Sequence, residues 1–364
     1  MPETAENIVS LRVNGQVYEG WTKSSVTRSL RTASGSFELE LTEKWPGQKT
    51  DWRIKRGDAV TLELDSELEL TGFVDIFAPS YDATTHAVRV SGRSKTCDLV
   101  DCAALVKGGQ FKGYTLAAIA KALAAPFGIN VIAGDTGAPF ADVQIQPGET
   151  CFEVIDRLCR LRAFLASDNA RGDLVLTRAG TGGFGRSGAL VEGRNIIAGS
   201  ASLSHAARFS EYVVRGQQAG SDDISGPQAS QPQARVTDAA VKRYRPNLIL
   251  AEAPGGIADM EKRARWQQRF AAADGTTAGL TVEGWRDDAG ALWQAGNLSA
   301  VDSPLLGLQM DMLIDETVKT QSNDGSRTEL ALVPPDALTP EPVSATAASA
   351  SSGAGKGSSW SEVI

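Results

Sequence analysis

The four cysteines are the residues of this sequence whose chemistry most needs to be decided. Cys97 and Cys102 lie in VSGRSKTCDLVDCAALV, among aspartates and basic residues. A structural zinc site requires four ligands, and the only histidines, His86 and His205, are far apart in the sequence. We therefore interpret these two cysteines as buried thiols and predict no metal site.

The other two cysteines have the spacing of core residues. In TCFEVIDRLCRL, Cys151, Ile155, Leu158 and Cys159 fall on one face of a helix. Free thiols persist in a reducing compartment, where they pack as small hydrophobic groups. The cysteine usage thus predicts a chain that is made and folded in the cytoplasm.

Two glycine-rich motifs resemble nucleotide-binding loops. Gly180, Gly182 and Gly185 spell G-x-G-x-x-G after an expected strand, but the following RSGALVEGRN has no helical period that would place a helix N-terminus on a pyrophosphate. GAGKGSS has the lysine of a phosphate loop, but it lacks glycine at position 350 and has Gly357 where Ser or Thr binds magnesium. Neither motif is assigned as a cofactor site.

Familiar catalytic motifs do not occur in the sequence. There is no H-E-x-x-H or G-x-S-x-G, and two histidines leave little room for imidazole catalysis. The two Arg-Gly-Asp strings, at 56–58 and 171–173, each stand where a turn enters a strand, which accounts for the glycine and aspartate. A glycosidase-like carboxylate pair stays open, because geometry rather than spacing identifies it. We assign no catalytic, cofactor-binding or metal-ligating residue and predict that the protein is not an enzyme.

Composition argues against some partners. The chain has 364 residues, a net charge of −8 and a pI near 5.1, so as a whole it does not attract a phosphate backbone. The N-terminus MPETAENIVS lacks a basic region followed by an apolar run, and no stretch approaches the roughly 18 apolar residues of a membrane span. We therefore do not expect the chain to bind duplex DNA tightly, to have a leader peptide or to span a membrane.

Residues 1–95 are expected to form a first β-barrel-like domain. LRVNGQVYEGW contains an Asn14-Gly15 turn between alternating apolar residues, the strongest short signal for a hairpin. Phe37, Leu39 and Leu41 then alternate with polar residues, as in a strand with one face in water. Short strands at this spacing are typical of a small barrel or sandwich.

Residues 96–190 are expected to form a small α/β domain. Thr115 is placed to cap a helix that ends at Pro126. Thr150 and Glu153 form a capping box at the start of the helix that carries Cys151. A strand, DLVLT, follows. The change of period from two to nearly four marks the boundary with the first domain.

Residues 191–335 are expected to form a second β-barrel-like domain that includes one helix. The helix, IADMEKRARWQQRFAA, has Ile257, Met260, Ala264 and Phe270 as its expected inner edge. Residues 216–235 are polar and rich in glycine and proline, which predicts a mobile loop. Residues 336–364 are dominated by Pro, Ala, Ser and Gly, which predicts a disordered tail.

One internal repeat of pattern links the two β domains. IKRGDAVTLELDSELELTGFVDIFAPSYDATTHAVRVSG and LWQAGNLSAVDSPLLGLQMDMLIDETVKTQSNDGSRTELALV share the order glycine turn, strand, turn, longer strand, polar turn, strand. The two segments have few identities. The pattern predicts two related β units in one chain, which would present a similar surface twice.

Three segments carry a resemblance to a known family: SGRSKTCDLVDCAA, QPGETCFEVIDRLCRL and LWQAGNLSAVDSPLLGLQMDMLIDETVKTQSNDGSRTELALVPPDAL. In these the chain is similar to the baseplate hub proteins of contractile-tailed bacteriophages. It most resembles the Mu-like group, also called tail protein P, which is related to the late control protein D group. The resemblance covers residues 8–338, and its most specific part is the last segment, with Trp293 and Asn297.

The resemblance implies a fold and a structural role. The fold is α+β, mainly β, with two similar β-barrel-like (tube-type) domains and an inserted small α/β domain, assembling as a trimeric ring. Such a homotrimer is a symmetry adapter between the hexameric tail tube and the trimeric central spike, and it contacts other baseplate proteins. DNA would only pass through its channel. The expected location is the virion tail baseplate, after synthesis in the host bacterial cytoplasm.

Two further expectations accompany this resemblance. An acidic chain suits a channel for DNA, because like charge repels phosphates and prevents sticking. The resemblance also places TCDLVDCAALV at the entry to the middle domain. There Leu99, Ala103, Ala104 and Leu105 are expected to pack beside the thiols.

Two other functions stay open. A tail-associated peptidoglycan hydrolase or wall-binding module would need an acid pair in a deep cleft, and no aromatic platform for sugar stacking is evident in the middle domain. A hub component of a type VI-like secretion spike or of a tail-derived bacteriocin would share the hub architecture.

Overall fold

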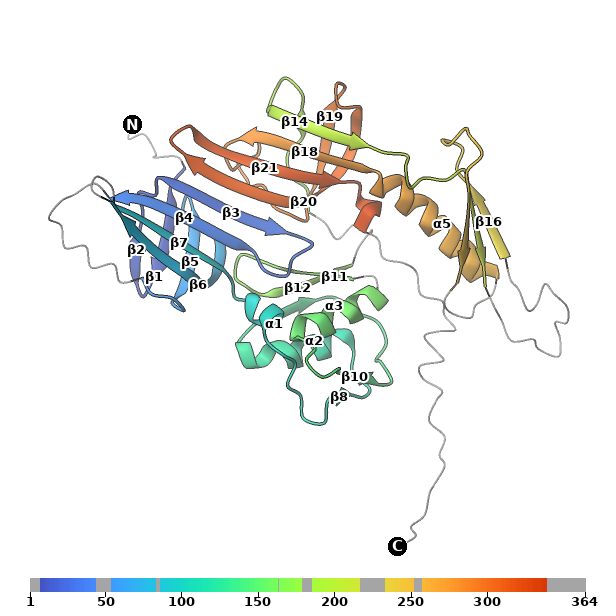
Figure 1. Ribbon diagram of the computed structural model, residues 1–364, viewed down its shortest axis with the longest axis horizontal. Helices are drawn as coiled ribbons and strands as arrows, with labels where there is room; N and C mark the ends of the chain where they lie inside the picture. The colour runs from blue at the N-terminus through green and yellow to red at the C-terminus, as the bar shows by residue number, and fades with distance from the viewer. Residues whose placement is uncertain are drawn as a thin grey trace, which may run out of the picture.

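The computed structural model describes residues 7–43, 54–82, 86–162, 164–178, 185–216, 233–251 and 257–338. Its elements fall into four groups, which we call the first β-unit, the middle domain, the second β-unit and the small sheet (Figure 1). The predicted class, α+β and mainly β, is confirmed.

The first β-unit comprises β1 (Val9–Val13), β2 (Gln16–Tyr18), β3 (Lys23–Ser29), β4 (Ser36–Glu43), β5 (Ala59–Leu64), β6 (Glu67–Tyr81) and β7 (His86–Ser94). The middle domain comprises α1 (Cys97–Asp101), β8 (Gln110–Phe111), α2 (Leu116–Ala124), the 3-10 helix η1 (Ala125–Phe127), β9 (Val131–Ala133), β10 (Val143–Gln144), α3 (Cys151–Arg162), β11 (Phe164–Asp168) and β12 (Leu174–Arg178). The second β-unit comprises β13 (Leu190–Val191), β14 (Ile196–Leu203), β18 (Thr276–Glu283), β19 (Leu298–Ser303), β20 (Leu308–Ser322) and β21 (Gly325–Val333). The small sheet comprises β15 (Glu211–Arg215), β16 (Gln233–Thr237) and β17 (Pro246–Leu250), with α5 (Ile257–Asp274) packed against it, and the 3-10 helix η2 (Pro335–Leu338) ends the described chain.

Two-residue turns set the strand pairing of the first β-unit. Asn14 and Gly15 have φ of 50° and 77°, as the tight turn between β1 and β2 requires, so the predicted hairpin is confirmed. Asp65 and Ser66, with φ of 51° and 67°, make the same kind of turn between β5 and β6. The alternation along these strands buries one face in a common core, of which Leu39 is a fully buried member.

The second β-unit repeats the end of the first, as the sequence pattern predicts. β5, β6 and β7 pair in order, and so do β19, β20 and β21. β6 and β20 each have 15 residues, and each carries a bulge where it pairs with the following strand, at Asp75 and Asp315 respectively. The two units therefore share strand order, strand length and the position of an irregularity.

The hydrogen bonds at the start of the repeat are also the same. The Gly57 N–H donates to the Val74 carbonyl at 2.8 Å, and the Gly296 N–H donates to the Ile314 carbonyl at 2.8 Å. Gly57 and Gly296 both have positive φ, 85° and 93°, which glycine adopts without steric cost. The glycine turns noted in the sequence thus serve one structural purpose in both units.

A joint between β3 and β20 merges the two β-units into one sheet. Residues 24–29 pair antiparallel with residues 316–321, so the strand order runs β14-β18-β21-β20-β3-β4-β7-β6 without interruption (Figure 1). Behind the joint, the Lys319 Nζ contacts the Glu69 Oε1 at 2.6 Å, and both side chains are almost fully buried. Arg28 donates to the Glu69 carbonyl at 3.0 Å. A buried ion pair therefore ties β20 of one unit to β6 of the other.

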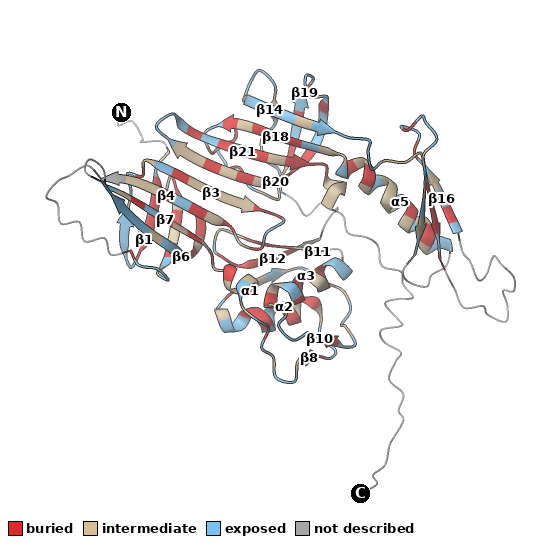
Figure 2. Cartoon of the chain, viewed as in Figure 1, coloured by how far each residue is buried: buried red, intermediate tan, exposed pale blue. Residues whose placement is uncertain are grey.

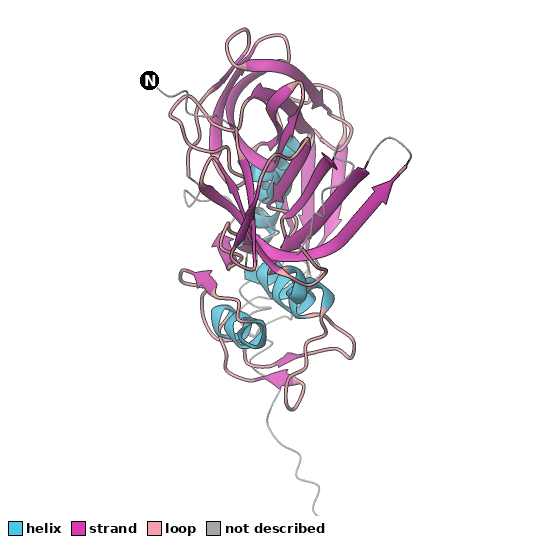
Figure 3. Cartoon of the chain, turned by 90° about the vertical axis from the view of Figure 1, so that its left-hand side faces the viewer, coloured by secondary structure: helices cyan, strands magenta, loops and turns pink. Residues whose placement is uncertain are grey.

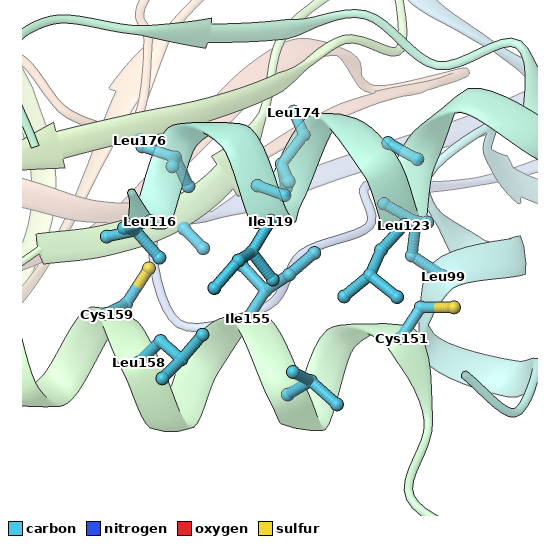
Figure 4. Close-up of a cluster of buried hydrophobic side chains, with 14 of the residues drawn as sticks. Leu99, Leu116, Ile119, Leu123, Cys151, Ile155, Leu158, Cys159, Leu174 and Leu176 are labelled. Atoms are coloured by element: carbon cyan, nitrogen blue, oxygen red, sulfur yellow. The ribbon is translucent and has the colours of Figure 1, made fainter. Parts of the chain in front are cut away.

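The middle domain packs its helices against a three-stranded sheet, β11-β12-β9. Both predicted helix starts are confirmed: the Thr115 hydroxyl accepts from the Ala118 N–H, and Thr150 and Glu153 exchange the two hydrogen bonds of a capping box. Figure 4 shows the apolar side chains of α2, α3 and β12 meeting in the core.

Asp168 docks the middle domain on the first β-unit. Its carboxylate accepts from the Arg28 guanidinium at 3.2 Å and from the Gly35 N–H at 3.1 Å. The Thr71 hydroxyl adds a third bond, to the Ala170 carbonyl at 2.9 Å. These contacts are largely buried, so water competes weakly for the bonded groups.

The predicted packing at the entry to the middle domain was wrong for two residues. Leu99 and Ala104 are buried, but Ala103 is exposed and Leu105 is 93% exposed. Ala103 forms an extended bridge with Thr150, and successive residues of an extended chain point to opposite sides. Burial of Ala104 therefore turns its two neighbours outward.

The inner edge predicted for α5 was correct in the middle and wrong at both ends. Met260 and Ala264 are buried among side chains of β15 and β16. Ile257, the first residue of the helix, is exposed, and Phe270 is half-buried. The buried stripe continues at Ala271, seven residues after Ala264, as the helical period requires.

Some predicted segments differ from the structure at their limits. Gly185 to Leu190, which the sequence pattern places in the middle domain, belongs to the segment that pairs with β19 of the second β-unit. Residues 217–232 of the predicted mobile loop and residues 339–364 of the predicted disordered tail lie outside the described residues. Residues 233–235 belong to β16, and residues 336–338 belong to η2.

Candidate assembly interface

Three of the four cysteines are buried in this fold, and Cys102 is half-buried. Cys151 and Cys159 lie in the core of the middle domain (Figure 4), Cys97 is buried at the start of α1, and all four thiols are free. Burial raises the pKa of Cys97 and of Cys159 to about 12 and also raises the pKa of Cys151. These three thiols are therefore protonated at neutral pH. Over the described ranges, no group of three or more His, Cys, Asp or Glu side chains is arranged to hold a metal ion.

Where the structure describes the glycine motifs, their glycines lie in turns or in hydrogen-bonded strand pairs. Gly180, Gly182 and the GAGKGSS segment lie outside the described residues. The Gly185 carbonyl accepts from the Leu298 N–H at 2.8 Å and so belongs to the pairing with β19. Both Arg-Gly-Asp strings form turns, as predicted, with φ of 85° at Gly57 and 72° at Gly172.

Carboxylates line a groove of about 1100 Å³ between the hairpin ends of the two β-units. Glu19 accepts from the Ser10 hydroxyl at 2.7 Å. Asp65 accepts from the Ile8 N–H at 2.8 Å and lies 3.7 Å from the Arg286 guanidinium. The contacts of these two carboxylates serve the fold, because they hold strand ends and turns together.

The most distinctive functional feature of the fold is a pair of open strand edges. β14 pairs with β18, and residues 76–81 of β6 pair with β7; apart from a bridge of Glu192 to Ile196, the described chain supplies no second neighbour to either segment. β14 is one end of the strand order, whereas β6 pairs through residues 67–73 with β5 and is open only along residues 76–81 (Figure 1). An open edge presents a row of backbone donors and acceptors to which another chain can add a strand.

Both open edges carry exposed apolar side chains. On β6, Ile76 is 47% and Tyr81 is 84% exposed, and on β14, Ile197 is 52% and Leu203 is 55% exposed. Figure 2 shows β14 mostly in the colour of exposed residues. Pro79, which has no N–H to donate, also lies on the open half of β6, and proline within sheets is largely confined to edge strands. Exposed apolar residues along an unpaired edge are typical of a surface that a partner covers.

The polar face of the sheet is hollowed at the joint between the units. A depression of about 720 Å³ is lined there mostly by small or charged side chains, among them Lys23, Ser25, Thr27, Glu38, Glu40, Ser91 and Thr320. The charges are partly paired: Lys23 lies 3.6 Å from Glu40, and Arg89 lies 3.5 Å from Glu38. Figure 3 shows how the strands curve. The apolar cores lie on the other face of these strands.

Sequence reasoning did not find the two open edges. An alternating strand has the same pattern whether its backbone edge is paired or free, because alternation reports the two faces and not the two edges. The one available signal was Pro79 in the second half of β6.

Three family models match the chain in order. Residues 8–94 match the N-terminal domain of Mu phage baseplate assembly protein GpP-like, and residues 96–178 match the second domain of baseplate hub protein gp44-like. Residues 257–341 match the fourth domain of Mu phage baseplate assembly protein GpP. The first two ranges coincide with the first β-unit and the middle domain.

Relatives of known name agree with these models. The baseplate hub protein gp44 of Escherichia phage Mu is 33% identical over 338 residues, which cover 90% of this chain and 88% of that protein. The solved 43 kDa tail protein of prophage MuSo2 from Shewanella oneidensis is 35% identical, with a TM-score of 0.79 over 92% of this chain and 100% of that one. A tail protein from Neisseria meningitidis MC58, 23% identical, shares the fold with a TM-score of 0.72 over 91% of this chain and 99% of that one. Within the described residues, the helices are too short or too polar to cross a membrane. The chain therefore belongs to the family of Mu-like phage baseplate hub proteins.

Proposed function

We propose that three copies of this chain form the central hub of a contractile phage tail. The homotrimer joins the hexameric tail tube to the trimeric spike, contacts other baseplate proteins and encloses part of the DNA channel. It has a structural role without catalysis. It is synthesised in the cytoplasm of the bacterial host and assembled into the virion baseplate.

The observation that carries this proposal is the repeated β-unit within one sheet. Three chains with two like units each present six similar surfaces to a hexameric partner, while the three chains themselves match a trimeric partner. The open edges of β14 and of residues 76–81 of β6 support closure into a ring, because pairing between them removes both edges at once.

In this proposal the domains keep their predicted order. Residues 1–95 and 191–335 supply the two tube-type domains, residues 96–190 the middle domain, and residues 336–364 a tail beyond the ring. We propose that the second tube-type domain starts at about residue 185, a few residues before the predicted boundary, because Gly185 to Val191 pair with β19.

The hollowed polar face of the sheet is the surface that we assign to the channel. In the first β-unit its cations are paired with carboxylates, as Lys23 is with Glu40 and Arg93 is with Asp75. In the second β-unit, strand alternation places Glu283, Glu316 and Glu329 on this face beside one cation, Arg327. An excess of carboxylates repels the phosphates of DNA and keeps the duplex from adhering to the wall.

The competing functions have weaker support. A hydrolase needs carboxylates that are free to act on a substrate, and two of the four described carboxylates that line the large groove, Glu19 and Asp65, are engaged with the fold. A hub of a type VI-like secretion spike or of a tail-derived bacteriocin would be built in the same way. The family match to phage Mu favours the phage baseplate.

Light scattering of the purified chain over a dilution series tests the proposal. We expect a mass of three times 38.4 kDa that does not change on dilution, because the permanent interfaces of obligate oligomers are large. A monomer at every concentration would contradict the hub and favour the hydrolase or the wall-binding module instead.

A further inference from the structure

The joint between the two β-units is a template for the contact between two chains. Within one chain, β20 accepts β3 along residues 316–321. β6 occupies the same place in the first unit as β20 in the second, yet its residues 76–81 have no such neighbour among the described residues. The strand that would pair with residues 76–81 of β6 is therefore the one equivalent to β3.

β14 is the equivalent of β3. β3 is the strand that pairs with β4, and β4 pairs with β7; β14 pairs with β18, and β18 pairs with β21. Apart from the bridge at Ile196, β14 is also open on its other side within the described chain. The strand that each first β-unit lacks is therefore present, unpaired, at the far end of the sheet.

The equivalence fixes which residues would meet. Aligning the two bulges makes Ser80 of β6 equivalent to Thr320 of β20. Following the ladders through β18 and β4 makes Ser200 of β14 equivalent to Ser25 of β3. Ser25 is paired with Thr320 within the chain, so Ser200 of one chain would lie opposite Ser80 of the next.

The side chains agree with this register, although they were not used to derive it. On one face it brings apolar or small residues together: Leu203 with Phe77, Ala201 with Pro79 and Gly199 with Tyr81. Pro79 has no N–H to donate to Ala201, so at this pair the ladder keeps only the bond from the Ala201 N–H to the Pro79 carbonyl. On the other face it pairs small residues, Ser202 with Ala78 and Ser200 with Ser80. An aromatic side chain across from an edge glycine covers the exposed backbone. A slip of one residue would place Tyr81 opposite Ala198 or Ser200 instead of Gly199 and mix the two faces.

We infer that β14 of one chain pairs antiparallel with residues 76–81 of β6 of a second copy, with Ser202 opposite Ala78. This inference rests on the proposed homotrimer and specifies how its sheet closes. Each chain then contributes the eight strands from β14 to β6 to one continuous ring. Of the apolar side chains that are exposed at the two edges, Tyr81 and Leu203 lie within this ladder and become buried across it.

A disulfide between chains tests the register. The Leu30 N–H donates to the Asp315 carbonyl at 2.8 Å, so the alternation of the ladder makes Thr27 and Val318 a non-hydrogen-bonded pair. Their equivalents, Ser202 and Ala78, would have Cα atoms about 4.5 Å apart, within the range of a disulfide. We expect the full-length variant Ala78→Cys/Ser202→Cys to form covalent trimers under mild oxidation, seen on a non-reducing gel.

A matched control separates register from mere proximity. Ala78→Cys/Ser200→Cys places the two cysteines on the same face but two residues out of register, where Cα atoms are about 7–8 Å apart, and should not crosslink. The chain without added cysteines reports on the native thiols. Mixing the single variants Ala78→Cys and Ser202→Cys should give covalent dimers and confirms that the bond joins two chains.

The outcomes distinguish this inference from the proposed hub. If light scattering shows a trimer and only the in-register variant crosslinks, the inference holds. A trimer in which neither variant crosslinks, or in which the control crosslinks preferentially, overturns the pairing and leaves the hub intact. A monomeric chain overturns the hub and the pairing together.

Discussion

The buried pair of Lys319 and Glu69 offers a sharp test of how the two β-units are held together. The Lys319 side chain is 1% exposed and the Glu69 side chain is 3% exposed, with 2.6 Å between Nζ and Oε1. Lys319→Met keeps the length and much of the apolar contact of the side chain but leaves the Glu69 carboxylate buried without its partner. Removing one member of such a pair costs about 3–5 kcal/mol, a large part of the roughly 5–15 kcal/mol that stabilises a domain.

The loss is measured from urea unfolding followed by tryptophan fluorescence, because Trp285 is buried in the core of the first β-unit. Lys23→Met is the matched control: Lys23 is 70% exposed and 3.6 Å from Glu40, so its loss should cost well under about 1 kcal/mol. The double variant Lys319→Met/Glu69→Leu removes both charges and should be less destabilised than Lys319→Met alone. Equal, small effects for Lys319→Met and Lys23→Met would refute the reasoning.

Three further predictions concern the middle domain and the β-sheet. Thr150→Ala removes the hydroxyl that accepts from the Glu153 N–H at 3.2 Å and should lower stability by about 1 kcal/mol, measured by thermal unfolding. The Gly92→Ala variant should have a much lower urea midpoint of unfolding than Gly134→Ala. A Cβ at Gly92 would lie 2.0 Å from the Phe73 carbonyl oxygen, whereas a Cβ at Gly134 would meet open space. Similar urea midpoints for the two variants would count against the packing described for β7. Burial raises the pKa of Cys159 to about 12, whereas the thiol of the unfolded chain has a pKa of about 8.5. The contribution of this buried thiol to folding stability is therefore fully present below about pH 8.5 and is lost as the pH rises towards 12. Unfolding free energies at pH 8 and pH 10 should therefore differ less in Cys159→Ala than in the unmodified chain, and an unchanged difference would argue against the burial of this thiol.

Local features of this fold were predictable because neighbouring residues encode them. The Asn14-Gly15 hairpin and the Thr150 capping box depend on a few consecutive residues, whose backbone preferences act before any distant contact forms. The helical spacing of Cys151 and Cys159 likewise indicated a buried face and hence unreactive thiols. The repeated order of turns and strands predicted two related β-units, since each unit rebuilds the same turns and the same long strand.

Only the tertiary structure decided how these parts meet. The pairing of β3 with β20 and the contact of Glu69 with Lys319 join segments about 250 or more residues apart, and no local preference specifies which strand becomes the neighbour. For the same reason Leu105, apolar in a buried-looking run, is exposed once the bridge of Ala103 sets the direction of the chain. Side-chain alternation determines which face of a strand is buried, whereas the arrangement of all the strands determines which edge remains free for another chain.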